Sequence, residues 1–273
     1  MELFQNRQND GFNLCVGLDS DPNKIPACVT GDRSTDRMVT FNLEIVKATK
    51  DFVCAYKINA GFYRPWLDGA PALQQTISDI HTVAPGIPVI LDSKFGDIGN
   101  TNDGYIEEVV TLFMADAATV NPYLGGLSLA KFLNMKEKGV IVLCHTSNEG
   151  AGELQHLVLQ DGRMLYETVA HSVATEWNKN GNCVLVVGAT YPAELRKVRA
   201  IAPNIPILIP GIGAQQGDLE AAVSAGKDND NKNVIINVSR GIIFASPNDD
   251  YAAAAGREAE KFHKQIQQYL NQQ

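Results

Sequence analysis

The segment Asp92-Ser-Lys94-Phe-Gly-Asp97 carries the most distinctive chemistry in the sequence. Residues two positions apart on a strand share a face, so Asp92 and Lys94 are expected to point into one pocket. Lys57 ends the apolar run before this segment, and neighbouring strands lie only about 4.8 Å apart. Asp97 follows in a glycine-flanked loop and need not point into its own pocket. Two lysines and one or two aspartates are therefore predicted to meet in one pocket; the alternative is a purely structural ion network that closes the barrel mouth.

A second group of residues is suited to binding a phosphate. A glycine-rich loop, Pro210-Gly-Ile-Gly-Ala-Gln-Gln-Gly217, leads into a helical stretch, and free backbone N–H groups before a helix favour an anion. After the next apolar run, Ser239-Arg240-Gly241 adds a guanidinium that can hold a phosphate through two parallel hydrogen bonds. Either motif alone is weak, but the two together predict a phosphate site. The residues expected to form it are Gly211, Gly213, Gln215, Arg240 and Gly241.

A third candidate is the loop 145–153, HTSNEGAGE, which combines small polar residues with two possible hinges, Gly150 and Gly152. Such a loop suits a lid that hydrogen-bonds a heterocycle and excludes water. The alternative is an ordinary surface turn.

An alternation of strands and helices must position these groups. Eight short apolar runs, most of them rich in Val and Ile, are typical of strands buried on both faces, and amphipathic stretches with helical spacing lie between them. Eight such units that close on themselves predict an α/β protein, a single (β/α)8 TIM barrel over residues 1–273. The predicted strands end at Asp19, Lys57, Asp92, Asn121, Cys144, Ala189, Gly211 and Ser239, and the predicted helices begin near Ser34 and then cover residues 71–83, 105–115, 127–138, 164–177, 193–201, 219–225 and 251–270.

Active sites of TIM barrels lie at the carboxyl ends of the strands, with phosphate commonly bound after strands seven and eight. The charged group and both glycine motifs fall at those ends. Asp19, Asn121 and the Thr146-Ser147 pair also follow predicted strands, so they join the expected site.

The composition excludes several classes of protein. Of 273 residues, 23 are basic and 31 acidic, for a net charge of −8, which argues against nucleic-acid binding and against a polybasic membrane surface. No apolar stretch approaches the roughly 20 residues that span a bilayer, and the N-terminal segment lacks the pattern of a signal peptide. Five cysteines without a CxxC pair and five histidines without metal-ligand spacing favour a reduced, cytoplasmic protein with no metal site.

The sequence resembles the orotidine 5′-phosphate decarboxylase family, whose members convert OMP to UMP and CO2 in pyrimidine biosynthesis. The resemblance runs from about Phe12 to the final helical stretch. The DxKxxDIxxT element is characteristic of the superfamily, and the TVNPYLGG, TSNxGxG and VVGAT elements are similar to its longer-chain branch. Other segments that carry the resemblance are CVGLDSDP, VCAYKINAGFY, IPGIGAQQGDL and INVSRGIIFA.

The resemblance implies catalytic roles for the charged group. Lys94 would protonate C6 as CO2 leaves, and Asp92 would lie beside the substrate carboxylate. Lys57 would pair with both aspartates and the ribose. Asp97 and Thr101 would reach into the partner subunit's site, so the resemblance also implies a homodimer with shared active sites.

The remaining contacts implied by the resemblance bind the substrate. Asp19 would contact the ribose, Ser147 the pyrimidine, Gln215 the base and phosphate, and Arg240 the phosphate. No cofactor is implied. Loss of CO2 leaves a carbanion at C6 outside the π system, so the site itself must stabilise charge, and an ammonium group aimed at C6 does so.

The sequence also departs from the family pattern at several positions. Ile58 stands where related sequences often have Pro, His145 where Arg or Lys is common, and Phe95 where Arg is frequent. Leu127 and Ala130 differ from the usual loop after TVNPYLGG. These differences replace no member of the charged group, so they bear on affinity and not on the reaction.

Three other functions remain open from the sequence. Magnesium-dependent sugar-phosphate aldolases and epimerases share the barrel and the DxKxxD element, and chelator sensitivity would separate them from a decarboxylase. A Schiff-base aldolase that uses Lys57 or Lys94 would be trapped by borohydride. A non-catalytic nucleotide-binding barrel would gain little from four crowded charges.

Overall fold

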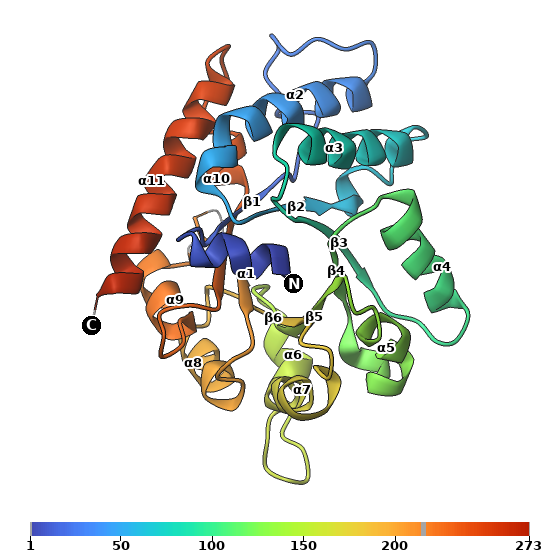
Figure 1. Cartoon of the computed structure of the whole chain (residues 1–273), viewed down its shortest axis with the longest axis vertical. Helices are drawn as coiled ribbons and strands as arrows, with labels where there is room; N and C mark the ends of the chain where they lie inside the picture. The colour runs from blue at the N-terminus through green and yellow to red at the C-terminus, as the bar shows by residue number, and fades with distance from the viewer. Residues whose placement is uncertain (1, 214–216, 273) are drawn as a thin grey trace.

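The computed structural model describes residues 2–213 and 217–272, and these form a closed barrel of eight parallel strands. Each strand pairs with the next along the chain, and β8 pairs with β1 to close the ring (Figure 1). The prediction of a (β/α)8 barrel is confirmed. The strands are β1 Leu14–Gly17, β2 Ala55–Asn59, β3 Val89–Phe95, β4 Ala117–Val120, β5 Gly139–His145, β6 Cys183–Val187, β7 Ile207–Pro210 and β8 Val234–Val238.

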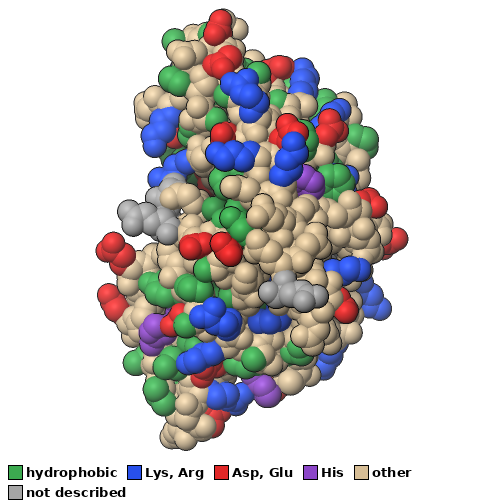
Figure 2. Space-filling model, turned by 90° about the vertical axis from the view of Figure 1, so that its left-hand side faces the viewer, with side chains coloured by type: hydrophobic (Ala, Val, Ile, Leu, Met, Phe, Trp, Pro, Cys, Tyr) green, Lys and Arg blue, Asp and Glu red, His purple; other side chains and the backbone are tan. Residues whose placement is uncertain are grey.

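Helices surround the barrel on its outside (Figure 1). On the face that includes α11, acidic and basic side chains are interspersed (Figure 2). No described helix is both long and apolar enough to span a bilayer. The helices are α1 Glu2–Asn9, α2 Ser34–Thr49, α3 Gly69–Val83, α4 Thr101–Glu107, α5 Gly126–Leu133, α6 Ala151–Gln155, α7 Leu165–Ser172, α8 Pro192–Ile201, α9 Leu219–Gly226, α10 Arg240–Ile243 and α11 Tyr251–Asn271.

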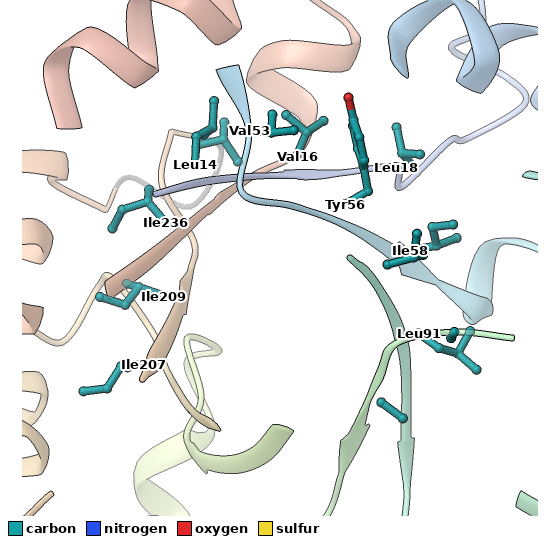
Figure 3. Packing of buried hydrophobic residues seen from close by; sticks show 14 of the residues in the cluster. Leu14, Val16, Leu18, Val53, Tyr56, Ile58, Leu91, Ile207, Ile209 and Ile236 are labelled. Atoms are coloured by element: carbon teal, nitrogen blue, oxygen red, sulfur yellow. The ribbon is translucent and has the colours of Figure 1, made fainter. Parts of the chain in front are cut away.

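Alternation along the strands produces two apolar cores. One set of side chains, including Leu14, Tyr56 and Ile209, points outward and packs beneath the helices (Figure 3). The other set, including Ile90 and Ile141, fills the inside of the barrel. Burial of each large aliphatic side chain contributes about 1.5–3 kcal/mol, so these two layers are the main source of stability.

Helix α1 was not expected from the sequence and closes the amino end of the barrel. It lies across that end in Figure 1, and Phe4 is 2% exposed within the inner core. The Arg7 guanidinium donates to the Val53 carbonyl at 2.6 Å, and the Gln8 amide donates to the Val234 carbonyl at 3.0 Å. The helix has little apolar content, so its periodicity is weak, and tertiary contacts hold it in place.

Two predicted helices have different bounds, and a third has the predicted extent but contains a π-helical turn. The helix expected at residues 105–115 begins at Thr101 and continues as a π-helical turn over Glu108–Leu112. The helix expected at 127–138 ends at Leu133. The stretch 164–177 is α7 followed by a second π-helical turn, Val173–Trp177. Such turns insert an extra residue into the helix, which a regular 3.6-residue period cannot indicate.

Candidate active site

The carboxyl ends of the strands surround a cavity of about 410 Å³. Charged and amide side chains form one part of its wall and apolar side chains of β5, β6 and β7 form another. A cavity of this kind at this end of a TIM barrel is the candidate active site. Its lining residues are Asp19, Lys57, Asn59, Asp92, Lys94, Thr119, Leu143, Thr146, Ser147, Asn148, Val186, Leu208, Pro210, Gly211, Ile212, Asn237, Ser239 and Arg240.

The Asp92 carboxylate lies between two lysines. Its Oδ2 accepts a hydrogen bond from Lys57 Nζ at 3.0 Å, and its Oδ1 accepts one from Lys94 Nζ at 2.6 Å. Asp19 Oδ1 lies 3.7 Å from Lys57 Nζ on the other side. Lys57 and Asp92 are buried, whereas the side chain of Lys94 is 48% exposed. The structure thus brings together four of the charged residues expected at the site.

The environment keeps the buried pair ionised. Burial alone would raise the pKa of Asp92, but the ammonium groups of Lys57 and Lys94 outweigh it and hold that pKa far below its usual range. Burial would likewise lower the pKa of Lys57, yet the carboxylates of Asp92 and Asp19 raise it well above the ordinary value. A fixed ion network therefore lines the cavity. Within the described ranges, 2–213 and 217–272, no group of three or more His, Cys, Asp and Glu side chains is arranged to hold a metal ion.

Strand β3 is distorted where it carries Lys94. Leu91 pairs with Ala118 of β4 and Phe95 pairs with Val120, so the register shifts between them. Lys94 has a φ of +52°, which is uncommon for a residue other than glycine. Backbone strain of this kind gathers at functional sites. Here it accompanies a lysine whose side chain is turned back toward Asp92.

The glycine-rich loop after β7 approaches its own chain closely. Gly211 and Gly213 have φ values of +104° and +76°, in the region that favours glycine. A Cβ on Gly217 would lie 2.8 Å from the Gly211 carbonyl oxygen, so a side chain there would force the loop apart. Gly211 lines the cavity, whereas Gln215, expected at the phosphate, lies outside the described residues.

The segment after β8 completes this side of the cavity. Arg240 and Ser239 line it, and Asn237 does so from within β8. The Ser239 hydroxyl and the Asn237 Oδ1 are buried with no hydrogen-bond partner in the described part of the chain. Gly241 follows inside the short helix α10 and does not line the cavity.

The loop after β5 also reaches the cavity, through Thr146, Ser147 and Asn148. The short helix α6 begins within this loop, at Ala151. The Thr146 N–H donates to Gln155 Oε1 at 2.8 Å, and Gln155 Nε2 donates to the Thr146 hydroxyl at 2.8 Å. A Cβ on Gly188 would lie 2.7 Å from the backbone of Ser147, so glycine there permits the loop to lie against the end of β6.

Like Gly241, Gly213 does not line the cavity, and the same is true of Asp97, Thr101 and Asn121. Asp97 lies in the loop after β3, where its carboxylate accepts a hydrogen bond from the Ile98 N–H at 2.7 Å. Thr101 is exposed at the start of α4. Asn121 caps the turn Pro122–Leu124 by accepting a hydrogen bond from the Tyr123 N–H at 3.1 Å. It borders a separate cavity, because β4 ends at Val120 and the chain then turns outward.

Sequence reasoning missed three polar residues of the cavity wall: Asn59, Thr119 and Asn237. The signal that could have found the first two is the two-residue alternation of strands. Asn59 lies two positions after Lys57, and Thr119 lies two positions before Asn121. Asn237 likewise lies two positions before Ser239.

Leu127 and Ala130 border a different cavity, and the other three departures from the family pattern lie behind the wall of the candidate site. Ile58 points outward into the helical layer (Figure 3). The Phe95 ring stacks on Tyr105 with centroids 4.6 Å apart. His145 Nε2 lies 2.8 Å from His156 Nε2. Because none of the three lines the cavity, these differences change the packing around the site and leave its surface intact.

The comparisons with known proteins agree with this geometry. A family model described as "Orotidine 5'-phosphate decarboxylase / HUMPS family" matches residues 12–255. The chain is similar to orotidine 5′-phosphate decarboxylase of Ralstonia pickettii (strain 12J), with 46% identity over 264 residues, which cover 97% of this chain and 96% of the relative. It is 47% identical over 246 residues to the protein of that name from Aromatoleum aromaticum, covering 90% of each chain. The solved structure of Leishmania donovani OMP decarboxylase matches with a TM-score of 0.82 at 38% identity, covering 97% of both chains. The chain therefore belongs to the orotidine 5′-phosphate decarboxylase / HUMPS family.

Proposed function

We propose that the protein converts OMP to UMP and CO2, with Lys94 delivering the proton to C6. The observation that carries this proposal is the Asp92 carboxylate held between Lys57 and Lys94 on the wall of a cavity that Arg240 also lines. Such a cavity offers a charge network to the reacting carbon and a guanidinium to the phosphate of one nucleotide.

In the reaction, the bond between C6 and the carboxyl carbon breaks and its electron pair stays on C6. The Lys94 ammonium stabilises that charge and then transfers a proton from Nζ to C6, which leaves a neutral amine. Since the Lys94 side chain is half exposed, solvent can return the proton after UMP leaves. Asp92 beside the substrate carboxylate would disfavour the bound ground state.

The two lysines have different parts in this scheme. Lys57 is buried, bonded to Asp92 and close to Asp19, and its raised pKa holds the proton on it. It acts as a fixed positive charge that keeps Asp92 ionised and also reaches the ribose. Lys94 contacts Asp92 alone among the described carboxylates and is the mobile proton donor.

We assign the rest of the wall to substrate binding. Asp19 contacts the ribose, Ser147 the pyrimidine and Arg240 the phosphate, while Gln215 bridges base and phosphate. We also assign the glycines at 211, 213 and 241 to the phosphate side of the site, where Gly211 lines the cavity. We further propose that binding energy from the phosphate organises the charges around C6.

We also propose a homodimer with shared sites. Asp97 and Thr101 do not line the cavity of their own chain, and Ile98 between them is 62% exposed. A partner seated on this loop would receive both residues. Residues 1–273 would act as one catalytic domain, in the cytoplasm and without a metal or organic cofactor.

The test is the ultraviolet absorbance of OMP after addition of the purified protein with EDTA present. Conversion to UMP under chelation would support the proposal and eliminate a magnesium-dependent aldolase or epimerase. Absence of conversion with UMP still bound would indicate a binding protein instead. Absence of both would redirect attention to sugar phosphates with magnesium.

A further inference from the structure

Thr119 on β4 is hydrogen-bonded to both members of the proposed reacting pair. It is 2% exposed, and its Oγ1 lies 2.8 Å from the backbone N of Lys94 and 2.9 Å from Asp92 Oδ1. A hydroxyl has one proton and two lone pairs. The Lys94 N–H can only donate, so the Thr119 oxygen accepts that bond through one of its lone pairs. The hydroxyl proton is then donated to the Asp92 carboxylate. One side chain thus joins the backbone of the lysine to the aspartate.

The register between β3 and β4 explains why this side chain is needed. Between the pairs Leu91–Ala118 and Phe95–Val120, residues 92–94 of β3 stand against Thr119 as a single residue of β4. The left-handed backbone of Lys94, with φ +52°, lies inside this bulge. The backbone N–H of Lys94 donates to the Thr119 hydroxyl at 2.8 Å, so this side chain supplies the acceptor for the bulged residue.

The bonds to Asp92 leave its carboxylate little freedom. Oδ1 accepts from Lys94 Nζ and from Thr119, and Oδ2 accepts from Lys57 Nζ. Two other buried threonines, Thr49 and Thr76, donate to the carbonyl four residues earlier in their helices, which is the ordinary local pattern, whereas Thr35 donates to the Asp68 carboxylate. The Thr119 hydroxyl instead spans two strands.

We propose, on the basis of the function proposed above, that Thr119 is a positioning residue for the decarboxylation. Its hydroxyl sets the orientation of Asp92 and fixes the backbone from which Lys94 reaches C6. Since a misplacement of about 1 Å can reduce catalysis about 100-fold, loss of this hydroxyl affects the chemical step more than substrate binding.

The first test compares Thr119→Val, which keeps the shape of the side chain but removes the hydroxyl, with the wild-type enzyme. We expect kcat to fall by about 100-fold while the KM for OMP changes by less than about threefold. Thr76→Val, at a buried threonine on the outer helix α3, is the matched control and keeps wild-type kinetics. Thermal unfolding and UMP titration verify that each variant is folded and binds.

A second pair keeps the proposal testable if Thr119→Val fails to fold. Thr119→Ser and Thr119→Ala differ by one hydroxyl, and we expect the serine variant to retain most of kcat and the alanine variant to lose it. Equal kcat values for the two, or wild-type kcat in Thr119→Val, would overturn the positioning role while wild-type activity still supports the decarboxylase. An inactive wild-type protein that binds UMP would overturn the decarboxylase and this role together.

Discussion

The two ends of the barrel interior are built from the same strands but have opposite chemistry. At the amino end, Ile90 of β3 and Ala55 of β2 belong to an apolar core that Phe4 closes from below. Two positions further along each strand, Asp92 and Lys57 face the cavity as a buried ion pair. A single step of strand alternation therefore separates the part that stabilises the fold from the part that carries the proposed chemistry.

This difference shows why the charges at the carboxyl end need a functional explanation. Taking a carboxylate and an ammonium group out of water costs several kcal/mol for each ion, and their attraction repays that only with good geometry. An apolar layer like the one below would be as stable or more so. The charges around Asp92 are thus better explained by their effect on a ligand than by stability. Substitutions at the two ends of the barrel interior should therefore affect different properties, activity at one end and stability at the other.

The largest effect is expected at the carboxyl end, from Lys94→Ala. Removal of the proton donor should reduce kcat by about 1,000-fold or more while the protein still binds UMP. Steady-state decarboxylation and UMP titration measure the two properties. Lys47→Ala on α2 is the matched control, because the Lys47 side chain has the same 48% exposure and also pairs with a carboxylate. Near-normal turnover by the Lys94 variant would contradict the assigned roles.

The opposite result is expected at the amino end, from Phe4→Ala. Loss of a buried phenyl ring should lower the free energy of unfolding by about 3–5 kcal/mol, and kcat of the folded enzyme should stay unchanged. Urea denaturation and activity assays below the transition provide both values. The control is Leu3→Ala on the same helix, where the side chain is 39% exposed and a small change is expected. A large loss of kcat in Phe4→Ala would show that the two ends are not separate.

A smaller catalytic effect is expected from Arg240→Ala, at the side of the cavity assigned to the phosphate. A hydrogen-bonded charge pair is worth about 1.5–3 kcal/mol, so kcat/KM should fall by about 10- to 100-fold, mainly through weaker binding of substrate and transition state. OMP kinetics and inhibition by UMP measure this loss. Arg196→Ala, at an exposed arginine of α8, is the control. Weakening of OMP and uridine binding to the same extent would refute a phosphate contact.

The same comparison explains what could be predicted from the sequence. Buried parallel strands are runs of Val and Ile, and they end where polar residues begin, so the barrel and the positions of Lys57, Asp92 and Asp19 followed from local pattern. The helix α1 did not, because Phe4 is held by contacts with the barrel interior and not by a periodic apolar face.

The details of the cavity wall were harder to predict from the sequence. The bulge that puts three residues of β3 against Thr119 depends on how two strands pair, and a single strand's sequence does not contain that information. Asn121 does not line the cavity for a related reason. The residue after it, Pro122, turns the chain outward, and the Asn121 side chain caps that turn. Local alternation predicts the face of a residue only while the strand continues.

The smallest effect is expected from a change at His145, a buried basic side chain whose environment differs from that of Lys57. Lys57 faces carboxylates, which raise its pKa. Burial lowers the pKa of His145 to about 4, and the nearby His156 lowers it too, while Glu194 opposes the shift. His145 therefore stays neutral in the native state at pH values where the unfolded chain binds a proton. The stability that His145 contributes is therefore lost as the pH falls from about 6.5 to about 4, because the unfolded chain gains a proton that the native chain does not.

We expect His145→Gln to flatten the acid side of the stability curve. Over that pH range, wild-type protein should lose on the order of 1–3 kcal/mol more than the variant, as measured by urea denaturation at each pH. The control is His171→Gln, because His171 on α7 is exposed and its replacement should leave the slope as in wild type. An identical slope in His145→Gln would mean that burial at this strand end does not keep the imidazole neutral. Wild-type kcat in the same variant would place the pair of His145 and His156 outside the chemistry, since neither lines the cavity. Lys57 differs from His145 because it lines the cavity and the carboxylates of Asp92 and Asp19 keep it charged.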